Sequence, residues 1–267
     1  MLESPCVEEN RRRGRPTVEK PTLGEEPTSF FMTWRDIAFW IRSARADAAL
    51  AKLRATMGLR ESFNQLYRSM RDPWGATLQR FRYQRQKYQT LLSMLPNREY
   101  NYVLDVGCGL GAFARRLTPH ARQVLGVDIS DEAVSEARRM SRGLPNVHYV
   151  QADICDFLAP SHAFDLIVLA DVLYYMAPIN DRMLKLLIEK IAQLLSPGGL
   201  LLLTNHYFFN IDRASRNISL IHDLFRRSPW LTRVAEYARA FYLATLMKRI
   251  EEDPQSDRPL LGSSLAV

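Results

Sequence analysis

A glycine-rich segment near the middle of the chain constrains the fold more than any other feature. Residues 102–117 read YVLDVGCGLGAFARRL, where glycine takes every second position after an apolar run that ends in an acid. The pattern predicts a buried strand, a tight turn and the start of a helix, because glycine adopts backbone conformations that other residues avoid. Such a turn also lets a ligand approach the backbone closely. The sequence therefore predicts an α/β fold with a binding site at residues 107–111.

Apolar strand-like segments and amphipathic segments alternate around this turn. Near-continuous apolar strands separated by helices indicate a parallel sheet that helices cover on both faces. The residues SPGG at 196–199 predict a turn, and residues 231–250 suit either a helix or two strands. Strands are expected at 102–106, 124–128, 147–153, 164–171 and 200–205, and helices at 84–95, 111–117, 130–140, 179–195 and 218–227.

Composition divides the 267 residues into four parts. Residues 1–28 are rich in Pro, Glu and Arg, so we expect a disordered tail. Residues 29–70 carry apolar residues at helical spacing and predict an N-terminal helical cap, followed by the main domain at 71–250 and a tail at 251–267. Basic residues on the other face of 29–70 also fit association with a membrane surface, but a cap packed on the core is the favoured interpretation.

Charge and cysteine content restrict the function classes. The formal net charge is +7, and RRRGRP at 11–16 resembles an AT-hook that binds the minor groove of DNA, although a solvated tail is favoured. Cys6, Cys108 and Cys155 form no CxxC pair, so we expect no metal site and a reducing compartment. Without a secretory signal or an apolar run long enough to span a bilayer, the chain is expected to be cytoplasmic.

The glycine turn fits two ligand patterns. Gly107, Gly109 and Ala112 satisfy the dinucleotide pattern G-x-G-x-x-G/A, whereas Asp105, Gly107, Gly109 and Gly111 satisfy the acid-x-Gly-x-Gly-x-Gly pattern of S-adenosylmethionine sites. The glycine spacing alone does not choose between them. Asp105 favours S-adenosylmethionine, because a carboxylate would repel a pyrophosphate but suits an ammonium group.

Two further acids are expected at the ends of neighbouring strands. Asp128 ends the second strand, where a carboxylate can accept hydrogen bonds from both ribose hydroxyls. Asp153 ends the third strand and can accept a hydrogen bond from an adenine amino group, with Ile129 and Ile154 on the two faces of the ring. Each acid alone could only cap a helix. Together they predict a nucleoside site at the carboxyl edge of the sheet.

Five segments together resemble the class I S-adenosylmethionine-dependent methyltransferases. The resemblance implies a Rossmann-like seven-stranded sheet of order 3-2-1-4-5-7-6 with strand 7 antiparallel, and S-adenosylmethionine as cofactor. It also implies that Cys108 in the turn and Ala170 after the fourth strand contact the cofactor, and it favours two strands over 231–250. The segments are VLDVGCGLGA at 103–112, LGVDIS at 125–130, VQADI at 150–154, FDLIVLADVLYY at 164–175 and LSPGGLLLLT at 195–204.

A narrower likeness points to the nodulation protein S branch, which N-methylates a chitooligosaccharide amine. It rests on DPW at 72–74, RYQRQKY at 82–88 and ADVLYY at 170–175. The branch implies that Trp74, Tyr83 and Lys87 close over the cofactor; Trp74 as a plain core anchor stays open. Gln84 replaces the glutamate that often follows this tyrosine in the branch, and the N-terminal helices are extra. The nodulation substrate is therefore not carried over.

The sequence determines least about the molecule that accepts the methyl group and about the general base that would take its proton. His206 is the best-placed general base after the fifth strand, with Tyr174, Tyr175 and His222 as alternatives, and Asp171 could orient an amine or cap a helix. Residues 170–173 read ADVL in place of the Asn/Asp-Pro-Pro-aromatic motif of nucleic-acid base methylation.

These observations favour a metal-independent N- or O-methylation of a small molecule, such as a sugar or natural-product scaffold, with the N-terminal helices helping to shape its pocket. A nucleic-acid or protein methyltransferase and a catalytically inactive cofactor-binding subunit remain alternatives. The sequence gives no indication of the oligomeric state.

Overall fold

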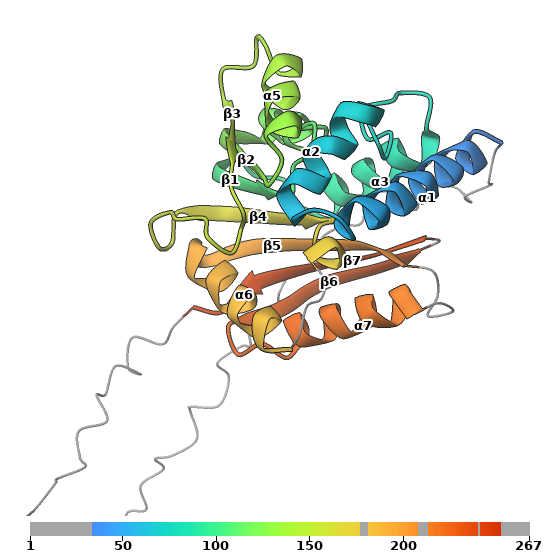
Figure 1. Ribbon diagram of the computed structural model, residues 1–267. Helices are drawn as coiled ribbons and strands as arrows, with labels where there is room; N and C mark the ends of the chain where they lie inside the picture. The colour runs from blue at the N-terminus through green and yellow to red at the C-terminus, as the bar shows by residue number, and fades with distance from the viewer. Residues whose placement is uncertain (1–33, 177–180, 208–212, 240, 252–267) are drawn as a thin grey trace, which may run out of the picture.

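A single seven-stranded sheet organises the computed structural model, which describes residues 34–176, 181–207, 213–239 and 241–251 (Figure 1). The strand order is β3-β2-β1-β4-β5-β7-β6. The first five strands in this order pair in parallel, and β7 runs antiparallel to both β5 and β6. The predicted order and the antiparallel seventh strand are confirmed. The strands are β1 Tyr100–Val106, β2 Ala121–Asp128, β3 Val147–Gln151, β4 Phe164–Ala170, β5 Leu195–Tyr207, β6 Leu231–Arg239 and β7 Phe241–Arg249.

Helices cover the two faces of the sheet, as alternating side chains along each strand require. Along β1, Val103 packs in one core cluster with α3, α4 and α5, whereas Leu104 and Val106 pack in a second cluster with α6 and α7. Ser130 caps α5 as predicted, because its Oγ accepts a hydrogen bond from the Ala133 N–H. The helices are α3 Arg82–Ser93, α4 Ala114–Leu117, α5 Asp131–Met140, α6 Asp181–Leu194 and α7 Arg213–Arg226.

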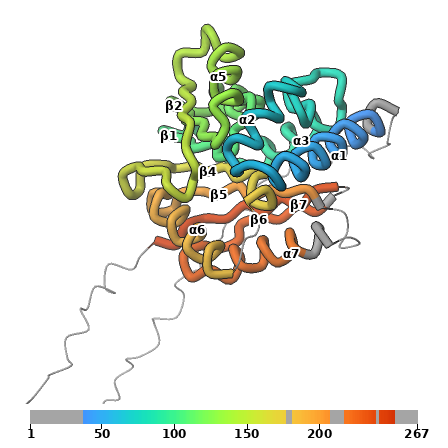
Figure 2. Tube along the Cα trace, in the orientation of Figure 1, coloured from blue at the N-terminus to red at the C-terminus, as the bar shows by residue number. Residues whose placement is uncertain are grey.

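Two N-terminal helices, α1 Trp34–Arg54 and α2 Leu59–Met70, lie against each other beside α3 (Figure 2). Their apolar residues Leu50, Phe63 and Leu66 form a third core cluster with Leu110 of the glycine turn and Ala133 of α5. The helices therefore pack over the carboxyl edge of the sheet, where the nucleoside site was predicted. No helix among the described residues is both long enough and apolar enough to cross a membrane.

Three local expectations differ from the structure. Residues 196–199 lie within β5 and do not form a separate turn. The pairing of β5 with β4 is irregular there, because Phe164 pairs with Leu195 while Leu166 pairs with Leu200. The helix after the glycine turn is short and continues as a 3-10 turn, Thr118–His120. Asp153 lies beyond β3, in the loop that follows it. The predicted tails, including the AT-hook-like residues 11–16 and Cys6, lie outside the described residues.

Candidate active site

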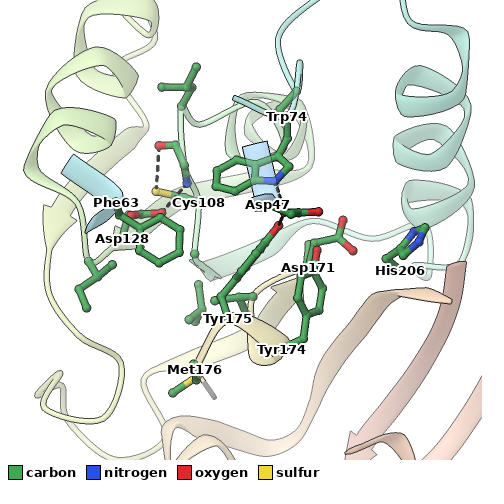
Figure 3. Close-up of a pocket in the computed structure, with 18 of the residues that line it drawn as sticks. Asp47, Phe63, Trp74, Cys108, Asp128, Asp171, Tyr174, Tyr175, Met176 and His206 are labelled. Atoms are coloured by element: carbon green, nitrogen blue, oxygen red, sulfur yellow. Dashed lines mark hydrogen bonds between the residues drawn. The ribbon is translucent and has the colours of Figure 1, made fainter. Parts of the chain in front are cut away.

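A cavity of about 640 Å³ lies at the carboxyl ends of β1, β2 and β4, and α1, α2 and α3 close its other side (Figure 3). Carboxyl ends of parallel strands are where open α/β sheets bind ligands. Most of the site residues predicted from the sequence contribute to its wall. They are Trp74, Tyr83, Lys87, Gly107, Cys108, Gly109, Asp128, Ile129, Asp153, Ile154, Ala170 and His206.

The glycine turn is held by hydrogen bonds inside the protein. The N–H groups of Gly107 and Cys108 donate to the Val127 carbonyl at 2.7 and 3.1 Å, and the N–H of Gly111 donates to the Cys108 carbonyl at 2.8 Å. Gly107 has a φ of 68°, and a β-carbon there would approach the Val172 side chain to 2.6 Å. Only glycine therefore fits this position, and most of the turn's N–H groups are already engaged.

Asp128 joins the turn to the end of β2. Its Oδ2 accepts a hydrogen bond from the Gly109 N–H at 2.8 Å, and its Oδ1 accepts one from the Ser130 N–H at 2.9 Å. The carboxyl group is buried, which raises its pKa, while backbone hydrogen bonds from Ser130, Gly109 and Ile129 oppose that rise. Each carboxylate oxygen keeps a second lone pair for a ligand hydroxyl.

Asp153, Ile129 and Ile154 line the cavity where the chain leaves β2 and β3. The Asp153 Oδ1 accepts a hydrogen bond from the Cys155 N–H at 2.8 Å, which fixes the carboxylate at the start of its loop. The two isoleucines follow β2 and β3, which are neighbours in the sheet. This part of the cavity therefore combines apolar contact with a hydrogen-bond acceptor, as an adenine site requires.

Two predicted residues, Asp105 and Gly111, are not among the residues that line the cavity. A β-carbon on Gly111 would clash with the Tyr149 ring, so this glycine serves the packing of the turn on β3. Asp105 is buried and its Oδ2 has no hydrogen-bond partner among the described residues. Burial raises the pKa of Asp105 to about 7, a hydrogen bond from the Ala114 N–H lowers it, and the nearby charge of Asp128 raises it further.

Aromatic rings gathered around Asp47 line part of the cavity, and the sequence analysis did not identify Asp47. Asp47 of α1 accepts hydrogen bonds on Oδ1 from the Trp74 Nε1–H at 3.0 Å and from the Tyr175 hydroxyl at 2.8 Å. Phe63 of α2 contacts both rings, with centroids 6.1 Å from Trp74 and 5.7 Å from Tyr175. Trp74 is thus a cavity residue held by the cap (Figure 3).

Tyr83 and Lys87 lie one turn apart on α3 and both reach the cavity. The Tyr83 hydroxyl donates to the Phe241 carbonyl at 3.3 Å, and its ring lies 4.9 Å from the ring of Trp40. The Lys87 ammonium is buried and forms an ion pair with Asp171, the residue directly after β4. The structure therefore joins Lys87 to the predicted acceptor side of the cavity.

The two histidines considered as bases have different surroundings. His206 lines the cavity near the end of β5, with its ring 4.8 Å from the ring of Trp40. His222 is buried in the core, where its ring nitrogens pair with Thr245 Oγ1 at 2.8 Å and Asn205 Oδ1 at 3.1 Å. Burial lowers the pKa of His222 to about 3, with a contribution from Arg226. His222 is therefore a structural residue, and its candidacy as a base is wrong.

The charged side chains that line the cavity are mostly acidic. Among the described residues that line it, Lys87 is the one lysine and arginine is absent. In the described part of the chain, the cavity included, no group of three or more His, Cys, Asp or Glu side chains is arranged to hold a metal ion. The cavity thus suits a ligand with hydrogen-bond donors or positive charge better than a phosphorylated one.

Comparison with known proteins agrees with this geometry. The Nodulation protein S (NodS) family profile matches residues 61–207. Nodulation protein S of Rhizobium tropici is 33% identical over 128 residues, which cover 48% of this chain and 52% of that protein. The protein of the same name from Sinorhizobium fredii is 27% identical over 140 residues, 52% of this chain and 63% of that protein. The matches thus span little more than half the length of these curated relatives.

A solved structure shares the fold over a larger part of the chain. The N-methyltransferase NodS from Bradyrhizobium japonicum WM9, in complex with S-adenosyl-L-homocysteine, superposes with a TM-score of 0.59 at 22% identity. The superposition covers 79% of this chain and 99% of that one. At this identity the likeness shows the fold. Because the family profile covers more than half of the residues, the chain belongs to the Nodulation protein S family, within the class I S-adenosylmethionine-dependent methyltransferase fold, as its sequence predicted.

Proposed function

We propose that this chain is an S-adenosylmethionine-dependent methyltransferase that acts on a small-molecule acceptor. One observation carries the proposal: a glycine turn and two strand-end carboxylates, Asp128 and Asp153, line the same cavity at the carboxyl edge of the sheet. The family membership supports the reaction class, and the complex of the Bradyrhizobium NodS with S-adenosyl-L-homocysteine supports the cofactor.

The residues of the turn and strand ends fit this cofactor part by part. Asp128 would hold the ribose hydroxyls, and Asp153 with Ile129 and Ile154 would hold the adenine. The turn at Gly107 and Gly109 would face the amino-acid end. Asp105 precedes this turn, and its buried Oδ2, which has no partner among the described residues, favours a positive charge there. Trp74, held by Asp47, would close this side of the site.

The same turn argues against a nicotinamide dinucleotide. A pyrophosphate is normally bound by free backbone N–H groups at such a turn. Here the N–H groups of Gly107, Cys108, Gly109 and Gly111 already donate to Val127, Asp128 and Cys108. Nor does any arginine line the described cavity to compensate a phosphate charge.

The chain itself contributes to catalysis mainly by aligning the acceptor atom with the methyl group. Bound S-adenosylmethionine supplies a methyl group that its sulfonium already activates. The cavity walls exclude water and bring the acceptor atom into line, which can supply much of the acceleration. His206, on the same cavity, is proposed to take the proton that the acceptor loses.

The lining of the cavity selects the acceptor class. Aromatic rings of Trp40, Trp74 and Tyr174 suit a ring-containing scaffold, and the excess of carboxylates disfavours phosphate-rich acceptors such as nucleic acid. We therefore favour an amine or hydroxyl on a sugar or natural-product scaffold, methylated in the cytoplasm. The free thiols of Cys108 and Cys155 fit a reducing compartment.

Calorimetry with S-adenosylmethionine, S-adenosyl-L-homocysteine and NAD tests the cofactor, and mass-spectrometric detection of methyl addition across aminosugars, phenols and RNA tests the acceptor. We expect micromolar binding of the first two ligands and methylation in the small-molecule set. Binding of NAD in their place would overturn the assignment. Methylated RNA would favour a macromolecular acceptor, and tight cofactor binding without turnover on any substrate would favour an inactive partner subunit.

A further inference from the structure

The buried ion pair between Lys87 and Asp171 is an unusual feature of the cavity wall. The Lys87 side chain is 2% exposed, and its ammonium contacts one carboxylate oxygen of Asp171 and lies 5.4 Å from the centre of the Tyr242 ring. Lysine is rarely buried to this extent, and removing two charges from water is costly even when they pair. A cavity wall built only for packing would not need this pair.

Asp171 uses only one of its carboxylate oxygens in this pair. Oδ2 contacts Lys87, whereas Oδ1 is shielded from solvent and has no hydrogen-bond partner among the described residues. A buried carboxylate oxygen without a donor is unfavourable, so such an atom on a cavity wall marks a place for a ligand donor. Figure 3 shows Asp171 on the same cavity as Tyr174 and His206.

The backbone at Asp171 is held in a conformation that most residues avoid. Its φ is +57°, in the left-handed region, and its N–H donates to the Thr204 carbonyl at 2.8 Å. Strained conformations of this kind persist where the surrounding structure imposes them, and they cluster at functional sites. The next residue, Val172, packs on Gly107 of the glycine turn. Asp171 is therefore positioned next to the proposed cofactor site.

We propose that Asp171 positions the methyl acceptor, an inference that rests on the proposed function. Its Oδ1 accepts a hydrogen bond from the N–H or O–H of the attacking group, and Lys87 keeps the carboxylate oriented through Oδ2. The acceptor lone pair then points at the methyl carbon. The new bond forms to that carbon, the electron pair of the broken S–CH₃ bond stays on sulfur, and the acceptor proton leaves to His206 or water.

A binding experiment distinguishes acceptor positioning by Asp171 from a purely structural role of the Lys87–Asp171 ion pair. The protein saturated with S-adenosyl-L-homocysteine is titrated with benzylamine, benzyl alcohol and benzyl methyl ether, followed by saturation-transfer NMR. The three probes share a ring for the aromatic wall, but the ether has no donor. We expect the wild type to bind the two donor-bearing probes roughly 10- to 100-fold more tightly than the ether, as a hydrogen bond to a carboxylate predicts.

The decisive variant is Lys87→Met combined with Asp171→Gly. Glycine accepts the positive φ, and removing both charges leaves no unpaired ion in the core. We expect the donor preference to disappear while the affinity for S-adenosyl-L-homocysteine changes less than about threefold. Asp171→Asn, which also tolerates this φ, should weaken benzylamine more than benzyl alcohol if the bound amine is cationic. The matched control, Arg122→Met with Glu99→Gly, removes an exposed ion pair and should keep the preference.

Two results would overturn the inference. One is a wild type without donor preference, or a double variant that retains it. The other is a double variant that loses both the donor preference and the affinity for S-adenosyl-L-homocysteine. The ion pair would then stabilise the structure of the cofactor site and would not position the acceptor. A wild type that does not bind S-adenosyl-L-homocysteine would instead refute the proposed function, so the two failures are distinguishable.

Discussion

The N–H of Gly109 donates a hydrogen bond to Asp128 Oδ2 at 2.8 Å, so the turn after β1 is tied to the carboxyl end of β2. Residues 19 positions apart in the chain thereby form one unit. The carboxylate both shapes the turn and faces the cavity. A cofactor bound here would depend on Asp128 twice, through its own hydrogen bonds and through the turn that Asp128 holds.

Replacing this carboxylate should weaken cofactor binding sharply. Asp128→Ala removes the acceptors for two ribose hydroxyls, and hydrogen bonds to charged groups contribute about 1.5–3 kcal/mol each. We therefore expect the Kd of S-adenosyl-L-homocysteine to rise by at least about tenfold in calorimetry. Asp156→Ala, an exposed acid of the loop after β3, is the control and should bind normally. Equal affinity of Asp128→Ala and wild type would remove Asp128 from the site.

Asp105 should make the stability of the cofactor-free protein depend on pH. Burial raises its pKa to about 7, whereas an unfolded aspartate titrates near 3.9. Between these values the folded chain holds a proton that the unfolded chain has lost, so the free energy of unfolding falls as pH rises through this window.

The variant Asp105→Asn does not titrate, so it isolates this effect. Its free energy of unfolding, relative to that of the wild type, should increase between pH 4.5 and pH 8. Urea titrations at both pH values measure the difference. A pH-independent difference would mean that the Asp105 carboxyl titrates normally in the folded protein.

Ser130 should link the cap to the main sheet energetically. Its Oγ accepts a hydrogen bond from the Ala133 N–H at 3.2 Å and donates one to Asn64 Oδ1 of α2 at 2.8 Å. Ser130→Ala removes the helix cap and leaves the buried Asn64 oxygen without this donor, so we expect a loss of about 1–3 kcal/mol in unfolding free energy. The control Ser69→Ala, on the exposed part of α2, should stay within about 0.5 kcal/mol. Equal losses in the two variants would contradict the proposed link.

Trp74 should report cofactor binding by fluorescence. Its ring lines the cavity and its Nε1–H is fixed by Asp47, so a bound cofactor would change its surroundings. We expect S-adenosyl-L-homocysteine to alter the intrinsic fluorescence of the wild type and of Trp230→Phe, whose tryptophan lies outside the cavity lining. The change should be clearly smaller in Trp74→Phe, where Trp40 is the tryptophan that still lines the described cavity. A full response in that variant would show that Trp74 does not cover the ligand.

The sheet and the side of the cavity formed by the glycine turn and strand ends were readable from the sequence for a physical reason. Their signals are local: apolar runs such as Phe164–Ala170 predict buried strands, and polar residues directly after them must lie at one edge. Asp128 and Asp153 were found in this way. By contrast, the prediction of strands at β6 and β7 needed the family resemblance, because the residue propensities there also allowed a helix.

The side of the cavity where we propose that the acceptor binds depends on contacts that no local pattern records. Asp47 meets Trp74 and Tyr175 across 27 and 128 positions of the chain, and Lys87 meets Asp171 across 84. The sequence favoured His206 over His222 but could not show which of them faces the cavity. His206 lies in β5 and His222 in α7, so their surroundings depend on how α7 packs on β5, which is a property of the assembled fold.

His206 offers the most direct test of the proton path. Its side chain lines the cavity opposite the glycine turn but is not among the residues proposed to hold the cofactor. His206→Ala should therefore slow turnover of an acceptor found in the screen by roughly 100-fold, the lower range for general acid–base catalysis, while the Kd of S-adenosyl-L-homocysteine stays within about twofold. His206→Gln, which keeps a polar side chain of similar reach, should be nearly as slow. Steady-state kinetics and calorimetry on the same preparations measure both quantities. Unaltered turnover in both variants would remove His206 as the base and leave alignment by the cavity walls as the chain's whole contribution.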